Sequence, residues 1–153
     1  KLYDVGCAGK IIKFEETEDK RYLITLKGIS RFDLISEKTN GKNFREAQVK
    51  WKNFSNDLQK NDTKEPFTNL KISLKRYFKI KNIKVNFEVI DKCYDYNFVD
   101  QITMICPLAF EEKQLLLETK SISKRSNLLQ SIIDGYASEE NISRLKILEQ
   151  TLK

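Results

Sequence analysis

The sequence of 153 residues contains no histidine, two prolines and three cysteines. The absence of histidine excludes Ser-His-Asp and Cys-His catalytic groups, as well as the commonest metal ligand. Cys7, Cys93 and Cys106 match no zinc spacing, so we expect free thiols in a reducing cytoplasm. No apolar run approaches the roughly 20 residues of a membrane helix. These absences predict a cytoplasmic chain without a metal, a cofactor or a membrane span.

The net charge of +6 can indicate an anionic partner. Only six of the 28 basic residues are arginine, whereas proteins that read nucleic acids usually rely on arginine. The stretch 71–84 interleaves lysines with aromatic residues, which is a pattern that can bind nucleic acid. However, Lys71, Lys75 and Lys79 recur at helical spacing, and the solvated face of an amphipathic helix explains them without a ligand. We therefore predict that nucleic acid is not the partner.

The opening stretch VGCAGKI offers two candidate chemistries. Cys7 lacks a histidine partner and alternates in phase with Val5, so it is predicted to be a small inward-facing residue. Gly6, Gly9 and Lys10 lack the spacing and the Ser/Thr of a phosphate-binding Walker A loop. Glycines inside a strand more often mark a bulge or a bend. We therefore assign no catalytic residue here.

Residues 1–52 show the two-residue period of β-strands. Tyr22, Ile24 and Leu26 share one face, which is expected to point inward, and Gly28 is expected to end that strand in a bend. The period predicts an antiparallel meander or a partly open barrel. The expected strands are 10–16, 20–28, 31–36 and 44–51.

Residues 53–63 are polar and are predicted to be a linker, after which residues 64–153 follow the helical period. Gly135 is expected to end one helix before a last helix begins at Ser138. The sequence therefore predicts an α+β chain, with a β lobe followed by an α-helical bundle. The expected helices cover 65–78, 87–93, a segment from 95 or 97 to 105, 111–120, a segment from 121 or 123 to 134, and 138–153, with a first apolar stripe of Phe67, Leu70, Leu74, Tyr77 and Phe78.

The segment YDVGCAGKIIKFEETEDKRYLITLKGISRFDLI closely resembles the LON substrate-binding domain, the N-terminal domain of ATP-dependent Lon proteases. The later segments FREAQV and PLAFEEKQLLLE are similar to further motifs of that family, so the resemblance covers nearly the whole chain. We interpret the matching signature residues as structural rather than catalytic. They are Gly6, Gly9, Gly28, Arg31, Phe32, Arg45, Glu112, Lys113 and Gln114.

The resemblance implies a PUA-like β lobe followed by a helical lobe, and a non-catalytic domain that captures unfolded or damaged polypeptides. The chain lacks a Walker A motif, a Ser-Lys protease segment and the family's first strand. We therefore expect an N-terminally truncated β lobe prone to self-association, either from a Lon protease or, as we favour, from a small standalone bacterial protein. RNA binding by a PUA-like module is the alternative. The polypeptide-binding residues are not identified, although Leu23 and Ile80 are candidates.

Overall fold

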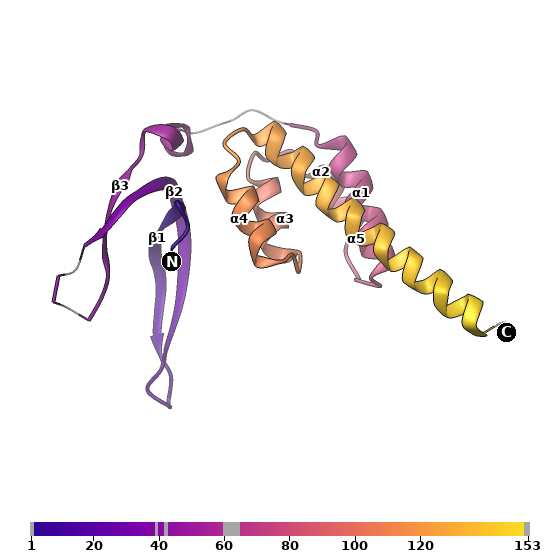
Figure 1. Cartoon of the computed structure of the whole chain (residues 1–153), viewed down its shortest axis with the longest axis horizontal. Helices are drawn as coiled ribbons and strands as arrows, with labels where there is room; N and C mark the ends of the chain where they lie inside the picture. Colours follow the sequence, from indigo (N-terminus) through magenta and orange to yellow (C-terminus); the bar gives the residue numbers. More distant parts are fainter. Residues whose placement is uncertain (1, 39, 42, 60–64, 152–153) are drawn as a thin grey trace. The chain divides into compact units, whose positions relative to one another are not determined.

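The computed structural model describes residues 2–38, 40–41, 43–59 and 65–151, with side chains described as far as residue 139 (Figure 1). The chain divides into two compact units, Lys1–Lys60 and Asn61–Lys153. We call them the β unit and the helical unit.

The described residues of the β unit form one open, three-stranded antiparallel sheet in the order β1-β2-β3. Its strands are β1 (Val5–Glu16), β2 (Tyr22–Lys38) and β3 (Glu46–Lys50). The prediction of four strands is wrong because β2 continues through Gly28 instead of ending there. The register between β1 and β2 shifts at this point, so that Ile29 is an extra residue in β2 and the strand absorbs it as a bulge.

A 3-10 helix, η1 (Lys52–Leu58), follows β3. The polar composition predicts that this segment belongs to a linker, whereas Phe54 is 2% exposed and η1 packs against β2. Phe54 lies beneath the guanidinium of Arg31, whose Cζ is 4.6 Å from the ring centroid. Burial of this aromatic side chain helps to hold the segment on the β unit despite its polar composition. Most of the remaining predicted linker lies outside the described residues.

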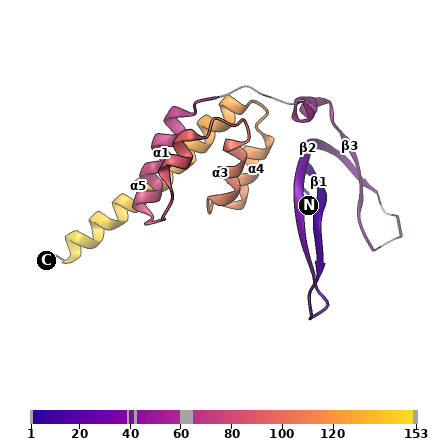
Figure 2. The ribbon, with the colours of Figure 1, turned by 180° about the vertical axis from the view of Figure 1, so that it is seen from behind.

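The helical unit contains α1 (Thr68–Ile80), α2 (Phe87–Lys92), α3 (Phe98–Ile105), α4 (Phe110–Glu118) and α5 (Ile122–Thr151). The predicted α1 stripe from Phe67 to Phe78 is confirmed, since all five of its residues are buried. This stripe packs against Leu129 and Ile133 of α5, which runs alongside α1 (Figures 1 and 2). One apolar core therefore joins the first and last helices of the unit.

Helix α5 passes through Gly135, so the predicted helix end at this residue is wrong. Leu129, Ile133 and Ala137 are buried at helical spacing on both sides of the glycine, and this continuous packing outweighs the low helix propensity of glycine. Most side chains of the helix predicted to begin at Ser138 lie outside the described residues.

Replacing Gly135 with alanine is expected to stabilise the helical unit by about 0.5–1 kcal/mol. A Cβ atom at this position meets nothing within 4 Å, so the gain in helix propensity carries no steric cost. The measurement is the free energy of unfolding from urea titrations followed by circular dichroism at 222 nm. A loss of stability in Gly135→Ala would contradict the continuous helix.

Candidate functional site

The β1–β2 hairpin carries a row of large apolar side chains on one face. Ile11 lies opposite Leu26 and Phe14 lies opposite Ile24 in the register, and residues opposite each other in a sheet share a face. Tyr22 continues the row, and its ring stacks on that of Phe14 with centroids 5.0 Å apart. We call these five residues the hairpin stripe.

All five residues of the hairpin stripe are exposed, between 48 and 61% of their accessible surface. The prediction that Tyr22, Ile24 and Leu26 point into a core is therefore wrong, because no described element covers this face of the hairpin. Contiguous exposed apolar surface on a folded protein commonly marks an interaction site. The hairpin stripe is the candidate site of this chain.

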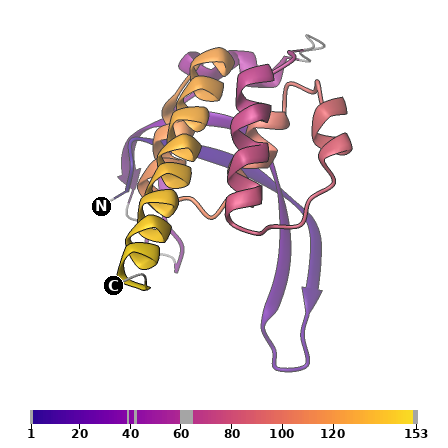
Figure 3. The ribbon, with the colours of Figure 1, turned by 90° about the vertical axis from the view of Figure 1, so that its right-hand side faces the viewer.

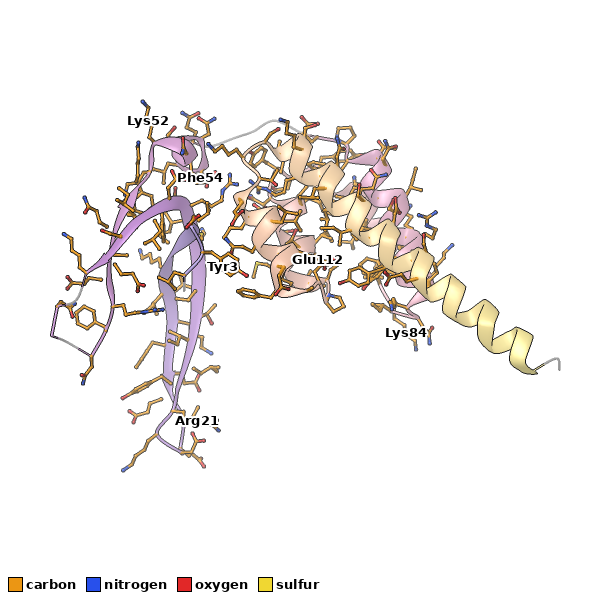
Figure 4. All side chains as sticks on the ribbon, in the orientation of Figure 1. Tyr3, Arg21, Lys52, Phe54, Lys84 and Glu112 are labelled. Carbon is orange, nitrogen blue, oxygen red and sulfur yellow. The ribbon has the colours of Figure 1, made fainter. Side chains whose placement is uncertain are left out.

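The hairpin is also open at its edges among the described residues. β3 pairs with β2 only from Asp33 to Lys38, so the hairpin beyond this point is a two-stranded ribbon (Figure 3). Its tip is the turn that holds Arg21 (Figure 4), where the Arg21 side chain contacts Asp19. A two-stranded ribbon is marginally stable by itself in water. This geometry favours a partner that covers or extends it.

The two candidates from the sequence occupy different places. Leu23 is 56% exposed and lies opposite Glu15, on the face of the hairpin away from the stripe. Ile80 is half-buried at the end of α1 in the helical unit. Neither of these two residues therefore belongs to the hairpin stripe.

A second group of exposed apolar side chains lies in the helical unit, at the connection between α3 and α4. It consists of Met104, Ile105 and Phe110. Ile105 is the last residue of α3 and is 71% exposed. This group has no strand edge beside it, and we treat it as the rival surface.

The signature residues of the β unit lie at close contacts within the sheet and with η1. Gly6 lies under the ring of Phe32, where a Cβ atom would come within 2.5 Å of the ring. Gly9 and Gly28 face each other at the register shift, and their Cβ positions are not crowded below 3.6 Å. Arg31 binds Asp57 through two side-chain bonds of 2.8 and 2.7 Å. None of these residues belongs to the hairpin stripe.

The remaining signature residues have different surroundings. Arg45 makes an exposed ion pair with Glu37 at 3.3 Å. The Glu112 carboxylate accepts the backbone N–H of Ala109 at 2.8 Å and the hydroxyl of Tyr136 at 2.7 Å, which ties the start of α4 to α5. In the same helix, the side-chain amide of Gln114 donates a hydrogen bond of 2.8 Å to the carboxylate of Glu118. Lys113 is half-buried.

The basic stretch of α1 is only partly a solvated face. Lys71 is buried, donates to the carbonyl oxygen of Asp91 at 3.0 Å, and lies 4.3 Å from the centroid of the Tyr94 ring. Lys75 pairs with the Asp91 carboxylate at 2.7 Å and Arg76 pairs with Asp134 at 2.5 Å. The prediction that Lys71 is solvated is wrong, because aromatic rings and a carbonyl replace its water. These three basic groups make their contacts within the helical unit.

The cysteines are free thiols in very different surroundings. Cys7 is exposed, so the prediction that it faces inward is wrong. Cys106 is buried, and this burial raises the pKa of its thiol to about 11. In the unfolded chain this thiol ionises at a lower pH than in the fold. Burial of the neutral thiol therefore contributes stability that is complete at neutral pH and is lost as the pH rises toward 11.

Ellman's reagent at neutral pH is expected to label Cys7 rapidly and Cys106 only after the helical unit unfolds. The reagent needs an accessible thiolate, and the fold denies Cys106 both access and ionisation. Mass spectrometry of proteolytic peptides identifies the labelled residue. Early labelling of Cys106 would contradict the packing described for α3 and the helices around it.

Among the described residues, no group of three His, Cys, Asp or Glu side chains could hold a metal ion. Nor does any described helix combine the length and apolar character that crossing a membrane requires.

Residues 1–135 match the family model of the ATP-dependent protease La (LON) substrate-binding domain. The chain is 26% identical over 141 residues to a Lon protease of Buchnera aphidicola, a match that covers 88% of this chain but 17% of that protein. It therefore spans less than a fifth of the length of this curated relative.

Two solved structures share the fold. One is a Lon N-terminal domain protein from Xanthomonas campestris, with a TM-score of 0.59, 16% identity, and coverage of 84% of this chain and 68% of that one. The other is the N-terminal domain of the Mycobacterium avium complex Lon protease, with a TM-score of 0.65, 15% identity, and coverage of 88% and 72%.

Proposed function

Because this chain belongs to the LON substrate-binding domain family, we propose that it binds unfolded or damaged polypeptides without catalysing a reaction on them. The observation that carries this proposal is the hairpin stripe, five large apolar side chains that lie exposed on one face of an open ribbon. Apolar contact is non-directional, so such a surface accepts many sequences without reading one.

The stripe discriminates between unfolded and folded proteins by a simple physical rule. A folded protein buries most of its large apolar side chains, whereas an unfolded segment presents them to any exposed apolar surface. Burying half-exposed side chains such as Phe14 and Leu26 against such a segment removes apolar area from water on both partners. The affinity therefore follows the exposed apolar area of the client.

We extend this proposal to finer features of the chain. The β unit is a PUA-like lobe, and the signature residues from Gly6 to Gln114 support the fold instead of contacting the client. The chain works in the cytoplasm, as a domain of a Lon protease or as a standalone member. Because it catalyses no reaction, we expect that incubating the chain with ATP and casein leaves the ATP and the casein unchanged. The family supports these proposals. The role of the signature residues is also supported by their position outside the hairpin stripe.

The test compares one protein in two states. A small protein whose disulfides have been reduced and carboxymethylated is labelled with fluorescein, and its binding is measured by anisotropy against the labelled native form. We expect the unfolded form to bind at least about tenfold more tightly, because only it exposes its apolar core. Equal affinity for both forms would overturn the proposal.

RNA binding is the alternative that the fold class suggests, and no contact in the described residues favours it. Lys71, Lys75 and Arg76, which lead the basic stretch, already contact protein groups. Titration with a short RNA at two salt concentrations decides the matter, because phosphate contacts produce a steep salt dependence. We expect no binding even at low salt.

A further inference from the structure

Residues 83–96 of the helical unit form a strap between two turns, with α2 in its middle beside α1 (Figure 1). At the first turn, Asn82 has a left-handed φ of 53°, and the N–H of Ile83 donates to the carbonyl oxygen of Phe78 at 2.9 Å. At the second turn, the Asp95 carboxylate accepts the backbone N–H of the second residue after it at 2.7 Å. The strap is therefore tied at both ends, and other contacts hold its middle.

The middle of the strap buries little apolar surface. Ile90 is 6% exposed, and it is the one buried side chain that the structure describes within the strap. Phe87 and Cys93 are half-buried against the core, whereas Val89 is 57% exposed. Helices α1 and α5, in contrast, bury several apolar side chains each in the same core. Segments with few buried apolar contacts open at a lower free-energy cost than the core of a domain.

The polar contacts between the middle of the strap and α1 converge on one residue. Lys71 donates from Nζ to the carbonyl oxygen of Asp91 at 3.0 Å, and Lys75 pairs with the Asp91 carboxylate at 2.7 Å. The Lys75 pair is exposed, so it is weak and is screened by salt. One further bond, of 3.3 Å, runs from the N–H of Glu65 to the carbonyl oxygen of Tyr94. Asp91 is therefore the point at which α1 holds the strap.

The ammonium group of Lys71 lies under the strap, and covering it carries a cost. Lys71 is 6% exposed, and its Nζ is 4.3 Å from the centroid of the Tyr94 ring and 5.7 Å from that of Phe98. Two rings and one carbonyl oxygen replace water around a group with three donors. Because dehydrating a cation is unfavourable, opening the strap regains hydration that offsets part of the lost contacts. The closed strap is therefore held weakly.

We propose that the strap opens by itself while the rest of the helical unit stays folded, and that Lys71 and Lys75 latch it closed through Asp91. Opening hydrates Lys71 and uncovers the core surface beneath Ile90. Because the latch is ionic, ionic strength sets the fraction of chains in the open state. The strap is thus a charge-controlled cover over part of the helical core, and it does not depend on the hairpin stripe.

Cys93 reports the opening, because it is half-buried within the strap at the end of α2. Cys106 is the internal reference, since it is buried and interacts electrostatically with Tyr77 of α1 and Lys113 of α4. The full chain is alkylated with iodoacetamide in sub-denaturing urea. Peptide mass spectrometry then gives the rate at each cysteine relative to its rate in the unfolded chain.

We expect Cys93 to react at least about tenfold more slowly than in the unfolded chain and at least about tenfold faster than Cys106. The Cys93 rate is expected to depend little on urea, because opening the strap exposes little surface. The Cys106 rate is expected to rise steeply with urea, because this thiol reacts only when the whole helical unit unfolds.

Asp91→Ala removes the partner of Lys75 and is expected to raise the Cys93 rate about threefold. Sodium chloride at about 1 M is expected to raise the rate of the parent chain in the same way. It is expected to add little in the variant, since screening and substitution remove the same contact. The matched control is Asp134→Ala, which breaks the ion pair of the neighbouring Arg76 outside the strap and is expected to leave the Cys93 rate unchanged.

Four results would overturn the proposal. Equal rates and urea dependence at Cys93 and Cys106 would show that the strap opens only when the unit unfolds. A Cys93 rate equal to that of the unfolded chain would show that the strap leaves this thiol uncovered. A Cys93 rate that neither Asp91→Ala nor salt changes would show that the latch does not hold the strap. A rise at both cysteines in Asp91→Ala would assign Asp91 to the global stability of the unit.

Discussion

Replacing Ile24 and Leu26 together with lysine is expected to weaken the binding of unfolded polypeptide by about thirtyfold. Each side chain contributes about 1 kcal/mol when the client covers its exposed half, and thirtyfold corresponds to about 2 kcal/mol. The lysines add repulsion toward basic clients and resist dehydration. Because both positions are already exposed, the fold is expected to tolerate the change.

The matched control is the double variant Met104→Lys and Ile105→Lys on the rival surface of the helical unit. It adds the same charge and removes two side chains that are even more exposed, at 79 and 71%. We expect its affinity for the unfolded protein to equal that of the parent chain. The reverse pattern, with loss in the Met104/Ile105 variant alone, would move the binding site to the helical unit. Circular dichroism of both variants verifies that each remains folded.

Replacing Asp57 with alanine is expected to destabilise the β unit by about 3–5 kcal/mol. The side chain of Arg31 is only 8% exposed and that of Asp57 18%, so the change removes a carboxylate that pairs with a buried guanidinium. The Asp57 carboxylate also accepts the backbone N–H of Arg31 at 3.0 Å, and this bond is lost as well. A loss of this size is a large part of the stability of a small domain.

The fluorescence of Trp51 reports this unfolding, because Trp51 is the single tryptophan and its ring packs edge-on against Phe32 at 5.5 Å. Guanidinium titrations of the parent and of Asp57→Ala measure the difference. Arg45→Ala is the control, since it breaks an exposed ion pair worth about 0–1 kcal/mol.

A second comparison separates the ion pair from the packing around it. The double variant Arg31→Met and Asp57→Leu removes both charges and keeps the apolar volume, so it is expected to be more stable than Asp57→Ala. If Asp57→Ala cost no more than Arg45→Ala, the assignment of a buried anchor between β2 and η1 would be wrong.

Local patterns predicted the parts of the fold that depend on neighbours in the sequence. The spacing from Phe67 to Phe78 predicted the buried stripe of α1, because a helix repeats every few residues whatever it packs against. Local signals failed where packing overruled them. Gly28 and Gly135 both suggested ends of elements, yet a bulge carries β2 onward and a continuous apolar stripe carries α5 onward.

The interpretation of function from the sequence also succeeded for local patterns and failed where burial decides. Tyr22, Ile24 and Leu26 alternate just as core residues do, since a face that binds a partner and a face that binds a core have the same period. Their exposure depends on which other elements lie over the hairpin, and the sequence of β2 does not predict those elements. Likewise, Arg31 and Asp57 lie 26 residues apart, and no local spacing predicted that they meet.

By itself, the sequence determined the family resemblance, the order of a β part before a helical part, and the face of α1 that is buried. The tertiary structure alone decided that no described element covers the hairpin stripe, that η1 is anchored to β2, and that Lys71 of α1 is buried. The physical reason is that secondary structure follows from the period of the chain, whereas burial depends on segments that are distant in sequence and meet only in the folded state.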